Sequence, residues 1–297
     1  ILRIAVAGEF LGHGVFALQQ KDYKDGNYYL TLTDSLAKEH FPSLIPKIQL
    51  RNVRLDIATG KFGSAGDRLE ELEKSLDSYD PVLKADFHFE KGFYHQLYKR
   101  FNISVEELGK ALDLYQENLA PLHPKIASTH TFLSYTYRGK YELKKSIHSI
   151  REALKIQEQV LGFKHPHLAT TYYYYATTLN MIGDYPSAAR YNEEAIRVYE
   201  QAMGQKGFSL GNYYSSLGYA KRGMNQPEAA ENAYRKALDY YLGPPVFRQI
   251  DKHYYNYSVT LFYNNKFGEG LKYLNKAYEV RKKAHGEDSP LLLNIYE

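Results

Sequence analysis

The feature that most constrains the fold is a helical hairpin pattern that returns along the chain at a fixed interval. Its clearest copy runs from His165 to Gly204. An alanine followed by leucine or isoleucine marks the same point of four copies, and 153 − 111, 195 − 153 and 237 − 195 all equal 42; these alanines are Ala111, Ala153, Ala195 and Ala237. Such a period predicts an array of supersecondary units, each of which buries its apolar face against its neighbours.

Each copy reads as two helices joined by a short turn, which in the clearest copy is Gly183–Tyr185. Small and aromatic residues recur at spacings of three and four, so they share one face of each helix. The first helix carries Tyr172, Tyr175, Ala176 and Leu179, and the second carries Ala188, Tyr191, Ala195 and Val198. One position of the first helix stays small, which predicts a close helix crossing; its residues are Ser134, Ala176, Gly218 and Ser258.

This pattern predicts seven repeats and a truncated eighth. The repeats span residues 1–41, 44–80, 82–122, 124–164, 166–206, 209–243 and 248–285, and the stub spans 289–297. We expect turns at Gly60–Phe62 and Phe101–Asn102, a second helix opened by Pro227, and a shorter first helix with a longer turn in the fourth repeat. No linker or domain boundary is visible, so the sequence predicts a single solenoid over residues 1–297.

The repeated residues identify a family resemblance. They are Tyr172, Tyr175, Ala176, Gly183, Tyr185, Ala188 and Ala195, then Tyr214, Leu217, Gly218, Ala230, Tyr234 and Ala237. This pattern resembles the tetratricopeptide repeat (TPR), and the long period with the segment from Ala153 to Pro166 is similar to the subtype found in kinesin light chain and in many bacterial arrays. The resemblance implies an all-α, right-handed superhelical solenoid. It implies little about function, because these repeats serve many unrelated partners.

Composition limits the possible functions. The 38 basic and 34 acidic residues give a net charge of +4, which offers no electrostatic argument for nucleic acid. No long apolar run predicts a membrane span. The absence of cysteine excludes disulfides, a thiol nucleophile and a thiolate metal site. We expect a cytoplasmic protein, although a chain without cysteine also suits an extracytoplasmic compartment. Because the chain begins with Ile1, it reads as a fragment or a processed chain.

Three short stretches contain residue types that are found in catalytic or ligand sites. His123-Pro124 and the segment from His165 to His167 could suggest a metal, but three or four converging ligands are required, so we interpret proline as a helix start and histidine as a loop residue. The segment Gly60–Gly66 lacks the order of a phosphate loop. The sequence therefore predicts no enzyme, no cofactor and no metal.

The family resemblance also places a binding surface. In tetratricopeptide repeats the first helix lines the concave groove, at positions three before, one after and four after the small crossing residue. Counting from the four crossing residues gives Thr131, Thr177, Ser215 and Val259 together with the eight predicted partner-binding residues, which are Tyr135, Arg138, Tyr173, Asn180, Tyr219, Arg222, Tyr255 and Phe262. Arg138 and Arg222 lie two repeats apart. This surface predicts a ligand with apolar anchors and at least one acidic group.

The sequence thus predicts a non-catalytic scaffold that binds a peptide or protein segment. One alternative is that the chain is the sensor arm of a larger signalling enzyme, such as a CHAT caspase-like protease, a histidine kinase or a nucleotide-driven protein. The groove would then be filled by the chain's own missing domain. Another alternative is an ordinary solvated face, because exposed tyrosine is common. Neither nucleic acid nor membrane insertion is expected.

Overall fold

The computed structural model describes residues 23–160, 165–204, 207–242, 250–286 and 292, and every regular element among them is a helix. The chain divides into two compact units, Ile1–Tyr141 and Glu142–Glu297, and the boundary falls inside the predicted fourth repeat. The predicted first helix of the first repeat lies outside the described residues. So does the predicted stub 289–297, apart from Leu292.

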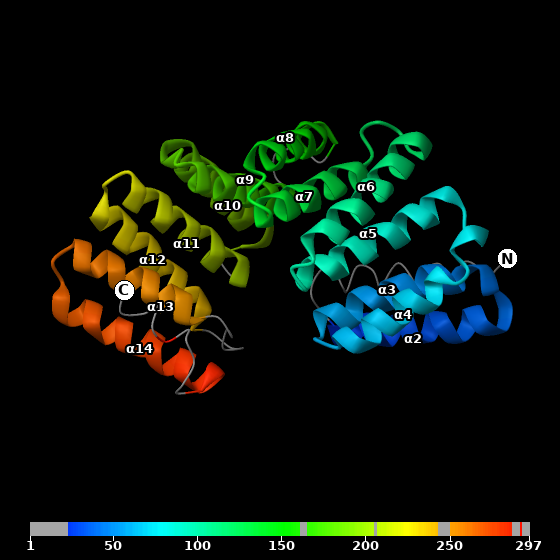
Figure 1. The fold of residues 1–297 in the computed structure, drawn as a ribbon, viewed down its shortest axis with the longest axis horizontal. Coiled ribbons are helices and arrows are strands. Elements are labelled where there is room, and N and C mark those ends of the chain that lie inside the picture. The colour runs from blue at the N-terminus through cyan, green and yellow to red at the C-terminus, as the bar shows by residue number, and fades with distance from the viewer. Residues whose placement is uncertain (1–22, 161–164, 205–206, 243–249, 287–291, 293–297) are drawn as a thin grey trace. The chain divides into compact units, whose positions relative to one another are not determined.

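Unit 1 is a series of helical hairpins (Figure 1). Its helices are α2 (Tyr23–His40), α3 (Ile45–Ala58), α4 (Phe62–Glu73), α5 (Pro81–Leu97), α6 (Phe101–Asn118) and α7 (Pro124–Gly139), with short 3-10 turns η1 (Pro42–Leu44) and η2 (Leu76–Ser78). The pairs α3–α4 and α5–α6 form hairpins, and α7 packs on α6. Buried Val53, Leu69 and Phe87 belong to a shared core, so the hairpins stabilise one another.

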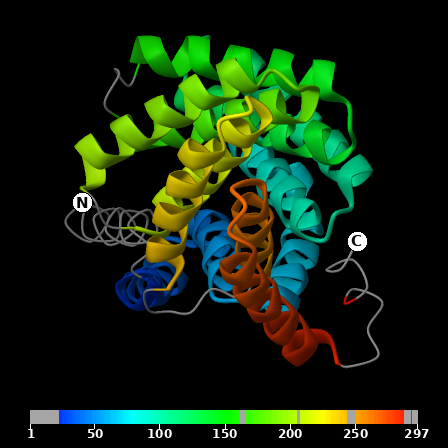
Figure 2. The same ribbon diagram turned by 90° about the vertical axis from the view of Figure 1, so that its left-hand side faces the viewer.

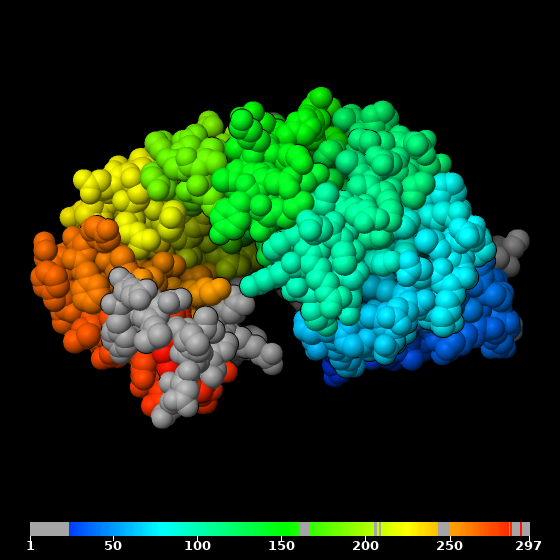
Figure 3. Space-filling model, in the orientation of Figure 1, coloured from blue at the N-terminus to red at the C-terminus, as the bar shows by residue number. Residues whose placement is uncertain are grey.

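Unit 2 repeats this arrangement. Its helices are α8 (Leu143–Val160), α9 (Pro166–Ile182), α10 (Tyr185–Met203), α11 (Phe208–Gly223), α12 (Pro227–Tyr241), α13 (Ile250–Tyr263) and α14 (Phe267–His285). Successive helices contact one another, and Figure 2 shows α13 and α14 lying side by side. In the space-filling view the colours of this unit follow one another in chain order (Figure 3), as expected of an array in which neighbours pack on neighbours.

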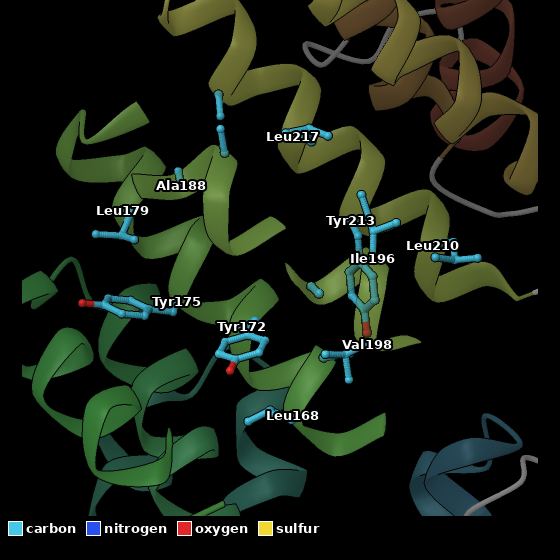
Figure 4. Packing of buried hydrophobic residues seen from close by; sticks show 14 of the residues in the cluster. Leu168, Tyr172, Tyr175, Leu179, Ala188, Ile196, Val198, Leu210, Tyr213 and Leu217 are labelled. Carbon is cyan, nitrogen blue, oxygen red and sulfur yellow. The ribbon is translucent and has the colours of Figure 1, made fainter. Parts of the chain in front are cut away.

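The main core of unit 2 collects the residues that the period predicts to face inward. Side chains from α9, α10 and α11 meet in it (Figure 4). Tyr172, Tyr175, Ala188 and Val198 are all buried. The tyrosines keep their hydroxyls near polar groups: Tyr172 donates to Glu158 at 3.2 Å. The 30 tyrosines therefore include many core residues, because a tyrosine can bury its ring while its hydroxyl finds a partner.

The small crossing positions are close-packed, as predicted. Ser134, Ala176 and Ser258 are fully buried. A methyl group added to Gly218 would lie 2.9 Å from the ring of Tyr234. The register read from the sequence is therefore correct.

The histidines before proline are helix caps. Nδ1 of His123 accepts the backbone N–H of Lys125 at 3.1 Å, and Nδ1 of His165 accepts that of His167 at 3.2 Å. In both cases proline follows in the first turn, where its missing N–H costs little. The two prolines start helices, as the sequence predicted, and the two histidines cap these helices, which the sequence analysis did not predict.

Each predicted turn extends into the helix that follows it. Phe62 and Tyr185 are the first residues of α4 and α10, so the turns are residues 59–61 and Gly183–Asp184 and not Gly60–Phe62 and Gly183–Tyr185. Phe101 is the first residue of α6, so the predicted turn Phe101–Asn102 is wrong and the turn is residues 98–100. Three-residue turns recur after α3, α5, α7, α11 and α13, each with a left-handed middle residue; these are Gly60, Lys99, Tyr141, Asn225 and Asn265. Among the described hairpins, only the turn Gly183–Asp184 is one residue shorter than these. The fourth repeat accordingly has the shorter first helix, 16 residues against 17, and the longer turn that we expected.

Candidate binding surface

The first helices of the hairpins in unit 2 are α9, α11 and α13, and each contacts the next. We call the side chains of these helices at the three predicted positions the first-helix surface. Two of the eight predicted residues, Tyr135 and Arg138, lie on α7 in unit 1, where the Arg138 guanidinium lies 4.8 Å from the centre of the Tyr135 ring. The other six lie in unit 2.

On α9 the structure separates two predicted residues. Tyr173 is half-buried, with its ring 5.2 Å from that of Tyr213. Asn180 is buried, and its Nδ2 donates to the carbonyl oxygen and to Oγ of Ser216 on α11, both at 3.2 Å. Asn180 therefore joins two first helices and does not face the groove, which corrects the sequence prediction for this residue.

On α11, as on α9, the predicted positions differ in how exposed their side chains are. Ser215 is buried and shares a hydrogen bond of 3.0 Å with Nδ1 of His253. Burial lowers the pKa of His253 to about 4, so the ring is neutral near pH 7. Tyr219 is 41% exposed, and the guanidinium of Arg222 lies 5.3 Å from the centre of its ring. Tyr219 and Arg222 are thus within reach of a ligand.

On α13 the predicted residue Phe262 contacts the second helix of its own hairpin. Phe262 stacks on Phe267 at 6.4 Å, and a methyl group added to Gly270 would lie 2.5 Å from the Phe262 ring. Phe262 therefore packs within the α13–α14 hairpin, and its assignment to the groove stays a prediction. Tyr255 is half-buried and packs against the second core cluster of this unit.

A hollow of about 200 Å³ lies at the end of α11, and we call it the turn pocket. It is lined by Tyr185, Tyr219, Arg222, Gly223, Asn225, Pro227 and Tyr263. The sequence analysis found two of these residues and missed Tyr185 and Tyr263. Their positions in the repeat could have identified them. Tyr185 begins the second helix nine residues after Ala176, and Tyr263 ends the first helix five residues after Ser258.

The charge of Arg222 is only partly satisfied. Its Nη1 is buried and has no hydrogen-bond acceptor. The guanidinium also lies 6.0 Å from the ring centre of Tyr234, a fully buried residue whose pKa is raised by burial. Aromatic faces attract the cation, but they do not replace the carboxylate oxygens that its N–H groups prefer.

A second hollow of about 400 Å³ lies between α8, α9 and α10. It is lined by Arg151, Leu154, Lys155, Glu158, Gln159, Tyr175 and Tyr191. Two of its lining residues contact each other, since Nε of Arg151 donates to the Tyr175 hydroxyl at 2.9 Å. This hollow lies partly on second helices, away from the predicted surface.

Unit 1 carries an aromatic cluster on its own first helices, which the sequence analysis did not identify. The Arg54 guanidinium lies 4.2 Å from the ring centre of Phe93, and its Nη2 donates to buried Glu90 at 2.9 Å. Phe89 and Phe93 both contact Phe132 edge-on at 5.1 Å. Gly92 stands one period, 42 residues, before Ser134, so it occupies the crossing position of the third repeat. Phe89 and Phe93 lie three before and one after Gly92, so counting from it would have found them.

Other ligand chemistry finds little support in the part of the chain that the structure describes. No three histidine, aspartate or glutamate side chains gather there as a metal site would require. None of the helices described is both long and apolar enough to span a membrane.

Comparison with known families agrees with the fold. Models of the tetratricopeptide repeat match residues 142–201, 211–242 and 253–291. A search of curated proteins by sequence finds no match.

Several solved structures share the architecture at low sequence identity. A Rap protein complexed with competence and sporulation factor is 14% identical over 97% of this chain and 80% of that one, with a TM-score of 0.77. The quorum sensor NprR in complex with its cognate peptide NprX is 16% identical over 97% and 81%, with a TM-score of 0.68. A putative kinesin light chain from Podospora anserina with nearly identical TPR-like repeats is 14% identical over 71% and 99%, with a TM-score of 0.57. With its 42-residue period, its close-packed crossing positions and three matching repeat models, this chain is a tetratricopeptide-repeat protein.

Proposed function

We propose that the chain is a non-catalytic scaffold that holds a peptide or protein segment on the first-helix surface of unit 2. The observation that carries the proposal is the pair Tyr219 and Arg222, which stack on each other where a ligand can reach them. Tyrosine and arginine are the residue types that most often dominate the energy of an interface. Tyr173, half-buried on the neighbouring helix α9, extends this surface.

Similar folds support a ligand of this class. The Rap structure contains competence and sporulation factor, and the NprR structure contains its cognate peptide. Both share the architecture of this chain over nearly its whole length, so an array of this kind is large enough to hold such a ligand. The identity of the ligand does not transfer at 14–16% identity.

The absence of catalysis is part of the proposal. The sequence has no cysteine nucleophile, and the surface that we assign to the ligand contains tyrosine and arginine without a paired general base. Purified protein should therefore show no turnover. Reproducible hydrolase, kinase or transferase activity from this chain would contradict the proposal.

The binding proposal is tested by selecting ligands from a displayed peptide library and titrating them against variants. Tyr173→Ala, Tyr219→Ala and Arg222→Glu should each weaken binding. Unit 1 offers a matched control, because the Arg100 guanidinium lies 5.3 Å from the ring centre of exposed Tyr98, the same distance as between Arg222 and Tyr219. Tyr98→Ala and Arg100→Glu should leave binding unchanged. If all three unit 2 variants bind like wild type, the first-helix surface is not the site.

A further inference from the structure

We propose that the exposed face of the second helix α8 docks an acidic segment of a second protein, while the first-helix surface holds its own ligand. Three cations form this face, Lys144, Arg151 and Lys155, and we call them the α8 stripe. All three side chains are exposed. Their spacings of seven and four residues place them on one side of the helix. Both the face and the partner therefore differ from those of the proposed function.

The repeat itself shows that this charge is particular to α8. Its stripe positions hold three cations and no anion, whereas the same positions hold one cation and one anion on α10, and one cation and two anions on α12. These residues are Pro186, Glu193 and Arg197 one period later, and Glu228, Arg235 and Asp239 two periods later. A merely solvated face would not require this difference between repeats. A concentration of one charge on one helix instead indicates a partner of the opposite charge there.

The cations of the stripe are not neutralised within the part of the chain that the structure describes. Lys144 and Lys155 form no ion pair or hydrogen bond there. Arg151 uses only its Nε, which donates to the Tyr175 hydroxyl at 2.9 Å, so its two Nη groups remain for an acceptor. By contrast, the neighbouring Lys145 is paired with a carboxylate of this chain at 2.7 Å. Carboxylates of a partner match the ammonium and guanidinium groups of the stripe.

A hollow beside the stripe offers a place for an apolar side chain. Arg151 and Lys155 line the hollow of about 400 Å³ between α8, α9 and α10. Leu154, Tyr175 and Tyr191 add apolar surface to it, and the two tyrosine rings lie 4.6 Å apart. An acidic segment that lies along α8 can therefore place one apolar residue in the hollow and its carboxylates on the stripe.

Glu158 favours a protein segment over a nucleic acid. It lines the hollow together with Lys155, and its carboxylate accepts the Tyr172 hydroxyl at 3.2 Å. A nucleic acid carries a phosphate on every nucleotide and would bring one against this carboxylate, whereas a protein segment can present a neutral residue there. Lys155 lies eleven residues after Lys144, about 16 Å along a helix, which a segment of about five extended residues spans.

The test uses the full chain and a fluorescent, blocked heptapeptide with leucine at its centre and glutamate at the other six positions. Fluorescence anisotropy should show saturable binding that added salt weakens and that the glutamine counterpart of the peptide lacks. Lys144→Gln and Lys155→Gln should each raise the Kd by up to about five-fold, as expected for exposed charge pairs, and the triple variant that also carries Arg151→Gln should not saturate. Arg235→Gln is the matched control, because it removes the same charge from the exposed position two periods after Arg151.

Other outcomes would overturn the assignment. Equal losses in Lys155→Gln and Arg235→Gln would mean that binding follows total charge and not the stripe. Equal affinity for a heptapeptide with glycine at its centre would remove the hollow from the site. Tighter binding of a seven-nucleotide RNA or of phosphatidylserine vesicles, with the same sensitivity to Lys144→Gln, would overturn the choice of a protein segment.

The two faces are separated by competition. A peptide selected on the first-helix surface should not displace the fluorescent heptapeptide, and displacement would contradict two independent sites. Failure at the α8 stripe is distinct from failure of the proposed function, because peptides selected on the first-helix surface would still respond to Tyr173→Ala.

Discussion

Gly92 provides the sharpest test of the packing register. It lies inside α5, and a methyl group added to it would lie 2.8 Å from Cγ of Leu108 and 3.2 Å from the Leu108 backbone nitrogen. Gly109 lies inside α6 of the same unit, and a methyl group there meets nothing within 4 Å. Alanine is favoured over glycine in a helix interior by about 0.8–1.0 kcal/mol. Overpacking a close contact costs about 1–3 kcal/mol.

We therefore expect Gly109→Ala to stabilise the protein by about 1 kcal/mol. Gly92→Ala should be neutral or destabilising by up to about 2 kcal/mol, because the same gain in helix propensity offsets part of the overpacking. Urea unfolding measures both changes, provided that the slope of the transition stays constant. Hydrogen exchange of the α5 and α6 amides gives the local stability. If Gly92→Ala stabilises the protein as much as Gly109→Ala does, the two helices do not cross at this residue and the register is wrong.

Three further changes test individual contacts. Asn180→Ala should destabilise by about 1–3 kcal/mol, seen as faster exchange in α9 and α11, because it removes a buried hydrogen bond to Ser216. Folding lowers the pKa of His253 from 6.5 to about 4, so between these pH values the unfolded chain binds a proton that the folded chain does not. The free energy of unfolding should therefore fall by at most about 3 kcal/mol as the pH drops from 6.5 to 4, and His253→Asn should abolish this loss. Burial raises the pKa of Glu107, but hydrogen bonds from His88 and Lys110 outweigh this effect and lower the pKa to about 2. The stabilisation that ionised Glu107 gives above pH 4.5 should therefore be lost as the pH falls toward 2, and acid unfolding curves of Glu107→Gln should lack this step.

Much of the fold could be predicted from the sequence because the repeat period carries local information. A small residue every 42 positions predicts where helices cross, and the structure packs Gly218 against the ring of Tyr234 and buries Ser134 completely. The prediction of a turn at Phe101 did not follow the period. Gly183 lies 84 residues, two periods, after Lys99, and both residues have a left-handed conformation, so counting back from Gly183 gives the turn at residues 98–100 that the structure shows.

Less of the site could be predicted, because exposure depends on the neighbouring repeat. The position four after the crossing residue carries Asn180 in one repeat and Arg222 in the next. The short amide reaches the adjacent first helix and is buried, as Gln96 also is where it donates to Thr136 at 2.6 Å in unit 1. Arg222 has a longer side chain, and it lines the turn pocket. Tyr185 comes from a different helix, so a count along one helix could not find it.

The most direct measurement of the central claim is site-specific photo-crosslinking to a selected peptide ligand. A benzophenone amino acid is placed at Tyr219 on the first-helix surface, and separately at Arg197, an exposed residue of second helix α10. Thermal unfolding and ligand affinity confirm that each substituted protein is intact. Crosslinks from position 219 and none from position 197 are the result that the account predicts. Crosslinks from position 197 with none from position 219 would place the ligand on the second helices and contradict it.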